Sequence, residues 1–540
     1  SPPIAGPAFA DWQAWASLAD RVLAGELQAF SHRCADAGFP PRWHRSLMTQ
    51  VDADPTPVHW TRLSDFGLAG GDIKGYWEPA RFDGLLVLVL AWLCTRRADL
   101  QQAIEQWLDS WCKDNPGNVG LQWKCGQETG IRLMHLLLAA ELLQRWAGVT
   151  PRPALTQLVA QHLRRIAPTM LYAIGQDNNH GSSEAAAMFS GGAFLARHAA
   201  AALAAQGRRW RATGRFWLEE RVAHLVLPDG SFSQHSVNYH RVLLDTVSFA
   251  ETVRRWHGEP PFSAQWLARI RAATDWLADV TDAQSGDAPN LGSNDGARLF
   301  VLHRLPYRDF RPSVQWAMRL FLDRSAYPPG AQDEPLDWLG LGRAGLAGGQ
   351  PATARLWPDG GYAKLAAPRA WALLRLPSYR FRPSHADGLH LDLWLDGQAL
   401  LCDGGTFAYN TEVRWLNYFS GTASHNTVQF DDRDQMPRLS RFLFGDWLAC
   451  TELRFDAAAS TMTAAYRDRQ GARHRRTVTL AAGHCTVVDE VSGFRDRAVL
   501  RWRLATSAGA WSCAGGECAN GSLRIAVSSS SAIARFECVE

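Results

Sequence analysis

The pattern of hydrophobic positions changes about two thirds of the way along the chain. From Trp12 to about Leu341, apolar residues recur at the spacing of one face of an α-helix, and short turns rich in Gly, Pro and Asn separate the repeats. Examples of such helical segments are 101–112, 130–146, 191–206 and 242–256. No alternating pattern in this part is strong enough to predict a sheet. The first part is therefore predicted to be helical.

A segment rich in Pro and Gly, 326–350, connects the helical part to a part with a different pattern. There, short alternating runs bounded by Gly, Asp and Pro predict antiparallel strands. These runs are 371–377, 389–405, 424–430, 461–467 and 474–491. Within the second run, Asp396-Gly397 is typical of a hairpin turn. Helices followed by strands predict two successive domains, 1–345 and 346–540, and not an alternating α/β fold.

Composition narrows the class of protein. A chain of 540 residues with 46% hydrophobic and 20% charged residues can bury a large core and is ordered. The formal net charge of +3 does not favour a dedicated nucleic-acid-binding protein. No apolar run reaches the length of a membrane span, and the longest, 84–94, fits a buried helix. The ten cysteines show no zinc-ribbon spacing, but Cys513 and Cys518 could pair.

The basic residues are almost all arginines, because lysine occurs only at Lys74, Lys113, Lys124 and Lys364. Codon bias in a GC-rich genome explains this pattern, while the functional interpretation is that planar guanidinium groups suit carboxylates and sulfates. The 24 tryptophans leave a similar choice. Some must pack in the core, but rings that line a cleft also stack on sugar faces.

A run of polar side chains interrupts the helical part at 177–181, Asp-Asn-Asn-His-Gly, where a new helix is predicted to start. The structural interpretation is an ordinary helix boundary, with Ser182 or Ser183 as the N-cap. The functional interpretation is that Asn179 and His180 face a substrate. The run by itself leaves this choice open.

A second polar cluster, in 229–244, places Gln234, Tyr239 and His240 at the start of another predicted helix. Together the two clusters offer amides, imidazoles and a phenol, without the paired carboxylates of a glycosidase. This set suits removal of the C5 proton of a uronic acid, because an amide and a His can stabilise the charge that grows beside the carboxylate. A Tyr or His can take the proton, and a Tyr can return one to the leaving oxygen. The reaction is then a β-elimination and not a hydrolysis.

A candidate metal site lies in the second part of the chain. His385, Asp403 and His425 stand in successive strand-forming segments and could converge across a sheet. Two imidazoles and a carboxylate make a plausible zinc set, with water or another group completing the tetrahedron. Asp387 and His390 are additional candidates. Because the residues are far apart in sequence and no short motif joins them, a purely hydrogen-bonded arrangement is the alternative.

Several segments, in this order and spacing, resemble the heparinase II/III-like superfamily of polysaccharide lyases over nearly the whole chain. In the helical part these segments are 72-DIKGYWEPAR-81, 118-NVGLQWKCGQETGIR-132, 178-NNHGSSEAA-186 and 234-QHSVNYHR-241. In the strand part they are 385-HADGLHLDLWLDGQALLCDGG-405 and 421-GTASHNTV-428. The resemblance implies an α+β multidomain fold, an incomplete α/α toroid followed by an antiparallel β-sandwich, with a cleft between them.

The resemblance also implies roles for individual residues. Asn179 matches the amide that neutralises the substrate carboxylate, with His180 beside it, and Tyr239 matches the catalytic tyrosine, a general acid and in some members also the base. Because a toroid presents helix starts to its cleft, Asn179 and His180 are expected to face the substrate, while Ser182 or Ser183 caps the helix and Asn178 is structural. The three candidate metal ligands match those of one divalent ion, commonly zinc. Candidate substrate-binding residues from the matching segments and their surroundings are Trp123, Gln127, Gln234, His240, Tyr418 and Arg438.

The chain departs from the family pattern at one position. Some relatives have a second His, proposed as a base, two residues before the first metal ligand, where this chain has Pro383. The base must then be His180 or Tyr239. Five further charged residues match family positions but are expected to form buried ion pairs between toroid helices. These residues are Glu78, Arg81, Glu128, Arg132 and Glu184.

The predicted function is cleavage of an anionic, uronic-acid-containing polysaccharide by a bacterial lyase. We expect a periplasmic or secreted protein whose leader is not visible in this chain. The identity of the polysaccharide, endo or exo action and the oligomeric state stay open. One alternative is a glycoside hydrolase that uses two of Asp72, Glu128 and Glu184. Another is a glycan-binding protein without catalysis, which the intact polar set at the two helix starts argues against.

Overall fold

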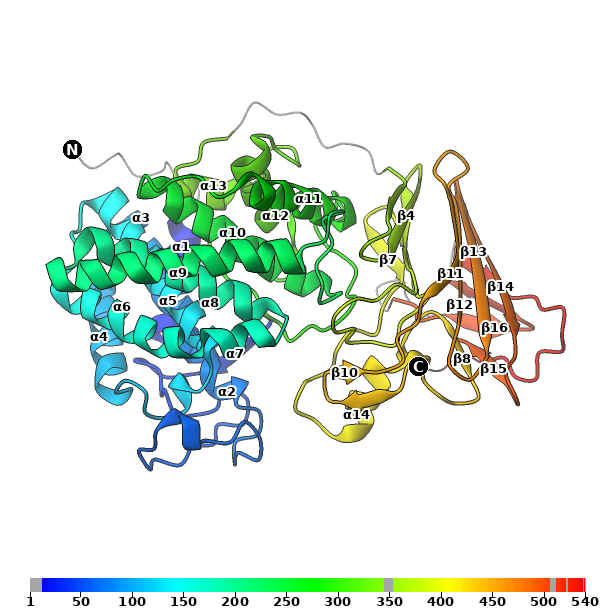
Figure 1. Ribbon diagram of the computed structural model, residues 1–540, viewed down its shortest axis with the longest axis horizontal. Coiled ribbons are helices and arrows are strands. Elements are labelled where there is room, and N and C mark those ends of the chain that lie inside the picture. Colours follow the sequence, from blue (N-terminus) through cyan, green and yellow to red (C-terminus); the bar gives the residue numbers. More distant parts are fainter. Residues whose placement is uncertain (1–11, 344–352, 506–510, 521–522, 538, 540) are drawn as a thin grey trace.

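The computed structural model describes residues 12–343, 353–505, 511–520, 523–537 and 539, and these residues form two parts (Figure 1). Helices make up the first part, up to residue 343, and antiparallel strands dominate the second part, from residue 353. This order confirms the predicted fold class. The predicted domain boundary between 345 and 346 lies outside the described residues.

The first part has inner and outer helices. Its helices are α1 (Trp12–Leu23), α2 (Lys74–Trp77), α3 (Asp83–Thr95), α4 (Ala98–Asp114), α5 (Gly126–Ala147), α6 (Pro153–Ile166), α7 (Met170–Gly175), α8 (Asn179–His198), α9 (Ala201–Leu225), α10 (Val237–Trp256), α11 (Ala264–Val280), α12 (Arg311–Ala317) and α13 (Glu334–Leu339). The inner helix α5 is buried along nearly its whole length, because neighbours surround it. The outer helix α4 buries one face, with Leu100, Trp107 and Trp111 at helical spacing.

The prediction of one helix over 191–206 was wrong, because the chain turns back at Ala199 and Ala200. α8 ends at His198, α9 starts at Ala201, and the two helices pack side by side. Gly192 and Gly214 allow this close packing, since a methyl group on either would collide with the backbone of the other helix. The turn itself contains neither glycine nor proline, so no turn signal marks it in the sequence.

The second part is built on two antiparallel sheets, with strand orders β3-β4-β5-β6-β7 and β11-β12-β13-β14. Their strands are β3 (Arg355–Trp357), β4 (Tyr362–Ala367), β5 (Ala370–Arg375), β6 (Leu391–Leu395), β7 (Gln398–Leu401), β11 (Cys450–Asp456), β12 (Thr461–Arg467), β13 (Arg473–Ala481) and β14 (His484–Ser492). Asp396-Gly397 turns between β6 and β7 as predicted, with positive φ at both residues.

Shorter elements surround the two sheets. They are α14 (Val413–Ser420), β8 (Val428–Phe430), β9 (Arg438–Ser440), β10 (Leu443–Phe444), β15 (Ala498–Leu500), β16 (Ser512–Ala514), β17 (Glu517–Asn520) and β18 (Leu523–Ala526). β8 pairs with β15, β9 with β10, and the last three strands form a small sheet. A disulfide joins Cys513 to Cys518 across β16 and β17, as the sequence suggested.

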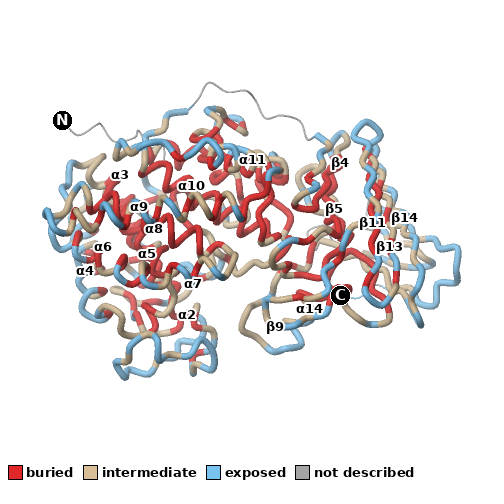
Figure 2. Tube along the Cα trace, viewed as in Figure 1, coloured by how far each residue is buried: buried red, intermediate tan, exposed pale blue. Residues whose placement is uncertain are grey.

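The first sheet lies between the helices and the second sheet. On one side, Trp357, Trp371 and Trp394 belong to the same apolar core as the toroid helices. On the other side, residues such as Leu374 pack with Val478 of β13 into a separate core. Figure 2 shows buried chain in both places, inside the helical part and between the strands. The shared core fixes the helix starts of the first part against the loops of the second.

Two further findings concern the first part. A short hairpin of β1 (Glu26–Ala29) and β2 (Arg33–Asp36) forms where the sequence predicted no sheet. Each of these strands has only four residues, which is too short for a clear alternating pattern. Among the described residues, no helix has the length and apolar content needed to cross a membrane.

Candidate active site

The polar run at 177–181 leads into α8. Asn178 is the N-cap, and its side-chain oxygen accepts a hydrogen bond from the backbone N–H of His180 (2.9 Å). Ser182 and Ser183 lie inside the helix, where both hydroxyls donate to the carbonyl of Asn179. The expectation that one of these serines caps the helix was therefore wrong, while Asn178 has the structural role predicted for it.

Asn179 is the first residue of α8 and is buried. Its backbone N–H donates to Oε1 of Gln234 (2.9 Å), so Gln234 ties the start of α8 to the loop that leads into α10. Among the described residues, the side-chain Nδ2 of Asn179 has no hydrogen-bond partner. A buried donor without a partner is costly, and a free donor at the positive end of a helix suits an anion.

His180 follows Asn179 at the start of α8, and its neighbours favour the protonated imidazole. Its Nδ1 lies 3.7 Å from Oε1 of Glu184, one helical turn away, and its side chain is 25% exposed. Burial by itself would lower the pKa of His180, but interactions with Cys125 and Glu184 outweigh burial and raise it to about 10. A protonated imidazole can attract and hydrogen-bond a carboxylate, but it cannot accept a proton.

Tyr239 lies in the first turn of α10, and its backbone N–H donates to the hydroxyl of the N-cap Ser236 (3.0 Å). The side-chain hydroxyl of Tyr239 accepts a hydrogen bond from the hydroxyl of Tyr409, in the second part of the chain (3.2 Å). Burial and the neighbouring carboxylate of Asp295 raise the pKa of Tyr239 well above its ordinary value. The phenol is therefore protonated in the resting protein, as a general acid must be.

Three residues next to Tyr239 were not singled out in the sequence. Tyr409 comes from the loop between β7 and α14, and Asp295 from the long loop between α11 and α12. Lys74, the first residue of α2, forms an ion pair with Asp295. Asp295 stands in the polar run 293-SNDG-296, which is typical of a turn, and none of the three stands at a repeated spacing. Lys74 is one of four lysines and lies within the matching segment 72–81, but neither fact assigns it a role.

The three candidate metal ligands converge in the second part. The ligand atoms of His385, Asp403 and His425 all lie within 4.8 Å of one another, and all three side chains are buried. Nδ1 of His385 and Nε2 of His425 have no hydrogen-bond partner among the described residues. Nitrogen atoms that hold a metal are left free in this way, so the donor set fits one divalent ion.

The charge states of this group also fit a metal. Burial and the neighbouring His425 lower the pKa of His385 to about 4, so its imidazole is neutral. Burial would raise the pKa of Asp403, but His425 and His390 outweigh it and hold that pKa below its ordinary value. Neutral imidazole and ionised carboxylate are the forms that bind metals. His390, which contacts Asp392 at 3.1 Å, lies behind the group and supports it.

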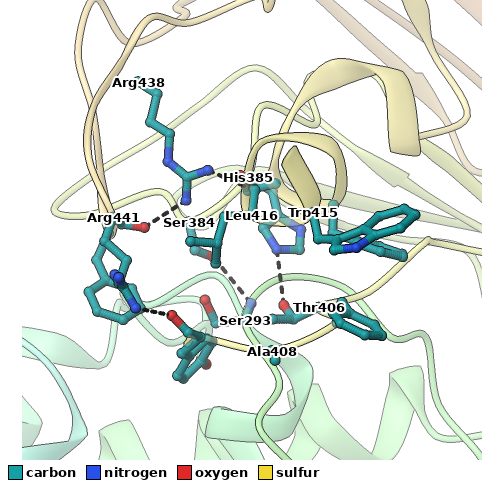
Figure 3. A pocket seen from close by; sticks show the side chains of 14 residues that line it. Ser293, Ser384, His385, Thr406, Ala408, Trp415, Leu416, Arg438 and Arg441 are labelled. Carbon is teal, nitrogen blue, oxygen red and sulfur yellow. Dashed lines mark hydrogen bonds between the residues drawn. The ribbon is translucent and has the colours of Figure 1, made fainter. Parts of the chain in front are cut away.

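His385 and Tyr409 line the same cleft between the two parts of the chain. Figure 3 shows His385 on one wall with Trp415 beside it and Arg441 across the cleft. Trp415 belongs to an aromatic rim in which its ring contacts that of Phe407. Aromatic rings beside polar groups suit the two faces of a sugar. The cleft therefore joins the candidate metal ligand His385 to Tyr409, whose hydroxyl contacts that of Tyr239 at the start of α10.

Two of the expected substrate-binding residues, Tyr418 and Arg438, lie in the second part of the chain near this cleft. Tyr418, on α14, is 39% exposed, and its hydroxyl accepts a hydrogen bond from Arg503 (2.8 Å). Arg438 lines the cleft, but its guanidinium donates to the carbonyls of Leu416 (2.7 Å) and Arg441 (2.8 Å). Arg438 therefore holds α14 in place and adds positive charge, while Tyr418 stays accessible.

Two other expected substrate-binding residues are corrected to core residues. Trp123 is fully buried, and its indole N–H donates to the carbonyl of Asn115 (3.3 Å). His240 is 1% exposed and stacks on Trp276 with ring centroids 4.5 Å apart. Neither side chain can reach a polymer. Gln127, in the first turn of α5, is also buried, so its side chain does not lie on a surface that a polymer could contact.

The matching carboxylates of the helical part are held in ion pairs. Glu128 accepts two hydrogen bonds from Arg81, both 2.7 Å, and Arg81 also pairs with Glu78 (2.6 Å). These are the buried pairs that the sequence predicted. Arg132 differs, because it donates to His162 and to backbone carbonyls instead. A carboxylate held twice by an arginine is not free to donate a proton, which removes Glu128 from the hydrolase alternative.

Comparison with known proteins places the chain in a family. The model of the heparinase II/III N-terminus matches residues 80–293, and the model of the heparinase II/III-like C-terminal region matches residues 349–540. The two matches cover most of the chain in the family's order. No curated protein sequence matched the chain.

Solved structures with the same fold carry related descriptions. A crystal structure of heparinase III has a TM-score of 0.61 at 14% identity, over 91% of this chain and 73% of that chain. The heparinase III product of BT4657 has 0.58 at 15%, over 96% and 77%. A mutant of the heparan sulfate lyase HepC from Pedobacter heparinus has 0.55 at 16%, over 91% and 71%. They confirm the toroid followed by the sandwich, and with the two family models they lead to one conclusion. The chain belongs to the heparinase II/III-like family and is a polysaccharide lyase.

Proposed function

We propose that the protein cleaves a uronic-acid-containing polysaccharide by β-elimination and leaves a 4,5-unsaturated uronate at the new end. The main support is the buried amide of Asn179, whose unpaired Nδ2 donor lies at a helix N-terminus beside the cationic His180. Together they can hold the substrate carboxylate and stabilise the negative charge that develops when the C5 proton leaves. A hydrolase has no need of such a pair.

In this proposal the hydroxyl of Tyr239 transfers both protons. Its oxygen accepts the proton from C5 while its own proton passes to O4. The C5–H and C4–O4 bonds break, the C4–C5 double bond forms, and the phenol ends in the state in which it began. The raised pKa of Tyr239 supports this role, because the hydroxyl is protonated when the substrate arrives. His180 is not the base, since its imidazole already carries a proton.

The test is an absorbance assay on a panel of uronic-acid polysaccharides. Alginate, hyaluronan, chondroitin, glucuronan and heparan sulfate belong in the panel, the last because solved relatives are described as heparinase III and a heparan sulfate lyase. A lyase makes a conjugated double bond that absorbs in the ultraviolet. New reducing ends without this absorbance would favour a hydrolase, and binding without new ends would favour a glycan-binding protein.

The charge of His180 should appear in the pH dependence of kcat/KM. Because the pKa of His180 is raised to about 10, its cation is fully present at neutral pH and is lost only as the pH rises through that value. We expect no ascending limb near ~6.5, the ordinary pKa of histidine. His180→Gln, which keeps a hydrogen-bond donor without the charge, should lower kcat/KM at least about 10-fold. An ascending limb near neutral pH that His180→Gln abolishes would instead make His180 the base.

We propose that the ion at His385, Asp403 and His425 is zinc, because two imidazoles and one carboxylate are a common zinc set. A bound ion would fix the wall of the cleft that carries His385 and would add positive charge there. Protein purified without chelator should contain about one zinc per chain by elemental analysis. His425→Ala should lose the ion, while His484→Ala, a change at an exposed histidine, should keep it. Metal retained in full by His425→Ala would exclude this site.

We also propose a periplasmic or secreted location in a bacterium. The Cys513–Cys518 disulfide supports this location, because structural disulfides form in oxidising compartments. A polysaccharide substrate found outside the cell points the same way. Cell fractionation followed by immunodetection tests this proposal, and recovery of the protein with the cytoplasmic fraction alone would refute it.

A further inference from the structure

A buried ion pair lies beside the phenols of Tyr239 and Tyr409. Lys74 pairs with Asp295, and their side chains are only 17% and 11% exposed. The Nζ atom of Lys74 also lies 4.2 Å from the centre of the Tyr409 ring, in cation–π contact. The carboxylate of Asp295 in turn lies next to the hydroxyl of Tyr239. The charged pair thus lies beside two phenols, and these phenols come from different parts of the chain.

The chain segments that meet here are far apart in sequence. Lys74 comes from the short helix α2, Asp295 from a loop between α11 and α12, and Tyr239 from α10, all in the first part. Tyr409 comes from the second part, and its backbone carbonyl accepts a hydrogen bond from Arg441. The ion pair therefore fixes the Tyr409 ring of one part against the Tyr239 hydroxyl of the other.

Stability alone is a weak reason for such a pair. Removing two charges from water costs several kcal/mol per ion, and a buried ion pair rarely stabilises a fold more than apolar side chains of similar size. Its position is informative instead. Lys74 contacts Tyr409, and Asp295 lies next to Tyr239, the residue of the proposed proton transfer. Because the charges of Lys74 and Asp295 are opposite, the pair gives both phenols charged neighbours without adding net charge.

We propose that Lys74 and Asp295 are positioning residues, which hold the hydroxyls of Tyr239 and Tyr409 in register for proton transfer across the boundary between the two parts. This inference rests on the proposed function of Tyr239. Asp295 orients the Tyr239 hydroxyl and opposes loss of its proton. Lys74 keeps Asp295 ionised and holds the Tyr409 ring in place. Neither residue needs to touch the substrate.

The other charged and titratable groups around Asp295 and the two phenols are consistent with these roles of Lys74 and Asp295. Besides Lys74, Arg81 also acts on Asp295, and together they outweigh burial and hold the pKa of Asp295 below its ordinary value. Tyr307 and Asp295 are the further titratable groups near Tyr409, whose pKa burial raises well above its ordinary value. Both phenols are thus protonated beside an ionised carboxylate.

The kinetic test uses Asp295→Asn and Lys74→Met on the polysaccharide that gives the largest absorbance change. Partners that orient metal ligands typically contribute about 10–100-fold in affinity or activity, and we expect a similar contribution from residues that orient a catalytic phenol, so each variant should lower kcat by about that factor. KM should stay within about threefold, because substrate binding energy is untouched. Lys74→Arg, which keeps the charge, should recover part of the loss. Lys113→Met, a change at an exposed lysine, is the matched control and should leave kcat and KM unchanged.

A titration of the phenols needs no substrate and separates this inference from the proposed function. Near-ultraviolet absorbance follows phenolate formation as the pH is raised. Asp295→Asn should bring into the measurable alkaline range one phenol that the wild-type protein keeps protonated, and this signal should disappear in Asp295→Asn/Tyr239→Phe. Lys74→Met should not produce it, because at the alkaline pH of this titration Asp295 is ionised even without Lys74. If both single variants produce it, the cluster has simply opened, and the inference is wrong.

The double variant Lys74→Met/Asp295→Asn covers the case in which Lys74→Met does not fold, because it leaves no unpaired buried charge. Its kcat should be as low as that of the single variants, since residues that act as a unit are not additive. Wild-type kcat in Asp295→Asn or in the double variant would overturn the inference. A raised KM with unchanged kcat would overturn it too, because it would make the pair a substrate-binding element. If no polysaccharide is cleaved, the phenol titration still decides the inference alone.

Discussion

Replacing Tyr239 with phenylalanine is expected to lower kcat by about 10²–10⁴-fold, the range typical of general acid–base groups. The change removes one oxygen atom from a ring that is buried at the start of α10. With that oxygen go both the acceptor for the C5 proton and the donor to O4. The rate of absorbance increase on the cleaved polysaccharide measures the effect, and KM should change little, because the aromatic ring remains in place.

Tyr172→Phe is the matched control for this variant, because Tyr172 lies on α7 with 74% of its surface exposed. It removes the same atom from an exposed side chain and should leave kcat unchanged. Circular dichroism should show that Tyr239→Phe is folded, since the aromatic ring keeps its packing and only the contacts of the hydroxyl with Tyr409 and Asp295 are lost. If Tyr239→Phe keeps more than about a tenth of wild-type kcat, Tyr239 does not carry the proton transfer.

Much of the fold could be predicted from periodicity, because long elements repeat their signal many times. β12 occupies the predicted 461–467, and α10 extends the predicted 242–256 by one turn towards its N-terminus. The failure at 191–206 has the opposite cause. Both α8 and α9 bury small residues, so the apolar spacing runs on across the turn at Ala199 and Ala200. A turn made of alanine has no signature in composition.

The site was harder to predict, because a shift of one position along a helix is enough to turn a side chain away from the site. Tyr239 and His240 are neighbours in a matching segment, but successive residues of a helix point about 100° apart. Tyr239 therefore contacts Tyr409, while His240 packs on Trp276 in the core. The same ambiguity misplaced Trp123. A matched segment indicates where a site lies, but not which of its side chains faces the site.

Lys74, Asp295 and Tyr409 escaped prediction for a different reason. Each lies in a loop or a very short helix, where no periodicity exists, and their contacts join residues separated by more than a hundred positions. Such contacts depend on how the toroid and the sandwich dock. The candidate metal ligands show the complementary case, since they also lie apart in sequence but stand in the loops that lead into β6, out of β7 and into β8. The order of the predicted strands was enough to predict that the metal ligands converge, whereas the ion pair between Lys74 and Asp295 could be found only in the three-dimensional structure.

Asn179→Ala is expected to lower kcat by about 10²–10³-fold, the loss found when one oxyanion-type donor is removed, which corresponds to about 2.7–4 kcal/mol. The reason is the unpaired Nδ2 at the start of α8, which can bind the substrate carboxylate most strongly when C5 has lost its proton. KM should rise only modestly, because binding of a polymer is spread over many contacts. Initial rates over a range of substrate concentrations separate the two effects.

Asn178→Ala is the neighbouring control, and the structure predicts the reverse pattern for it. Asn178 caps α8 through His180, so its loss should destabilise the protein by about 1 kcal/mol and lower Tm. Its kcat should change much less than that of Asn179→Ala. Asn179→Ala should in turn keep Tm nearly unchanged, because the backbone N–H that binds Gln234 remains. If Asn178→Ala abolishes turnover and Asn179→Ala does not, the two roles are exchanged. If neither variant changes kcat, the polar run is only a helix boundary, and the carboxylate must bind elsewhere in the cleft.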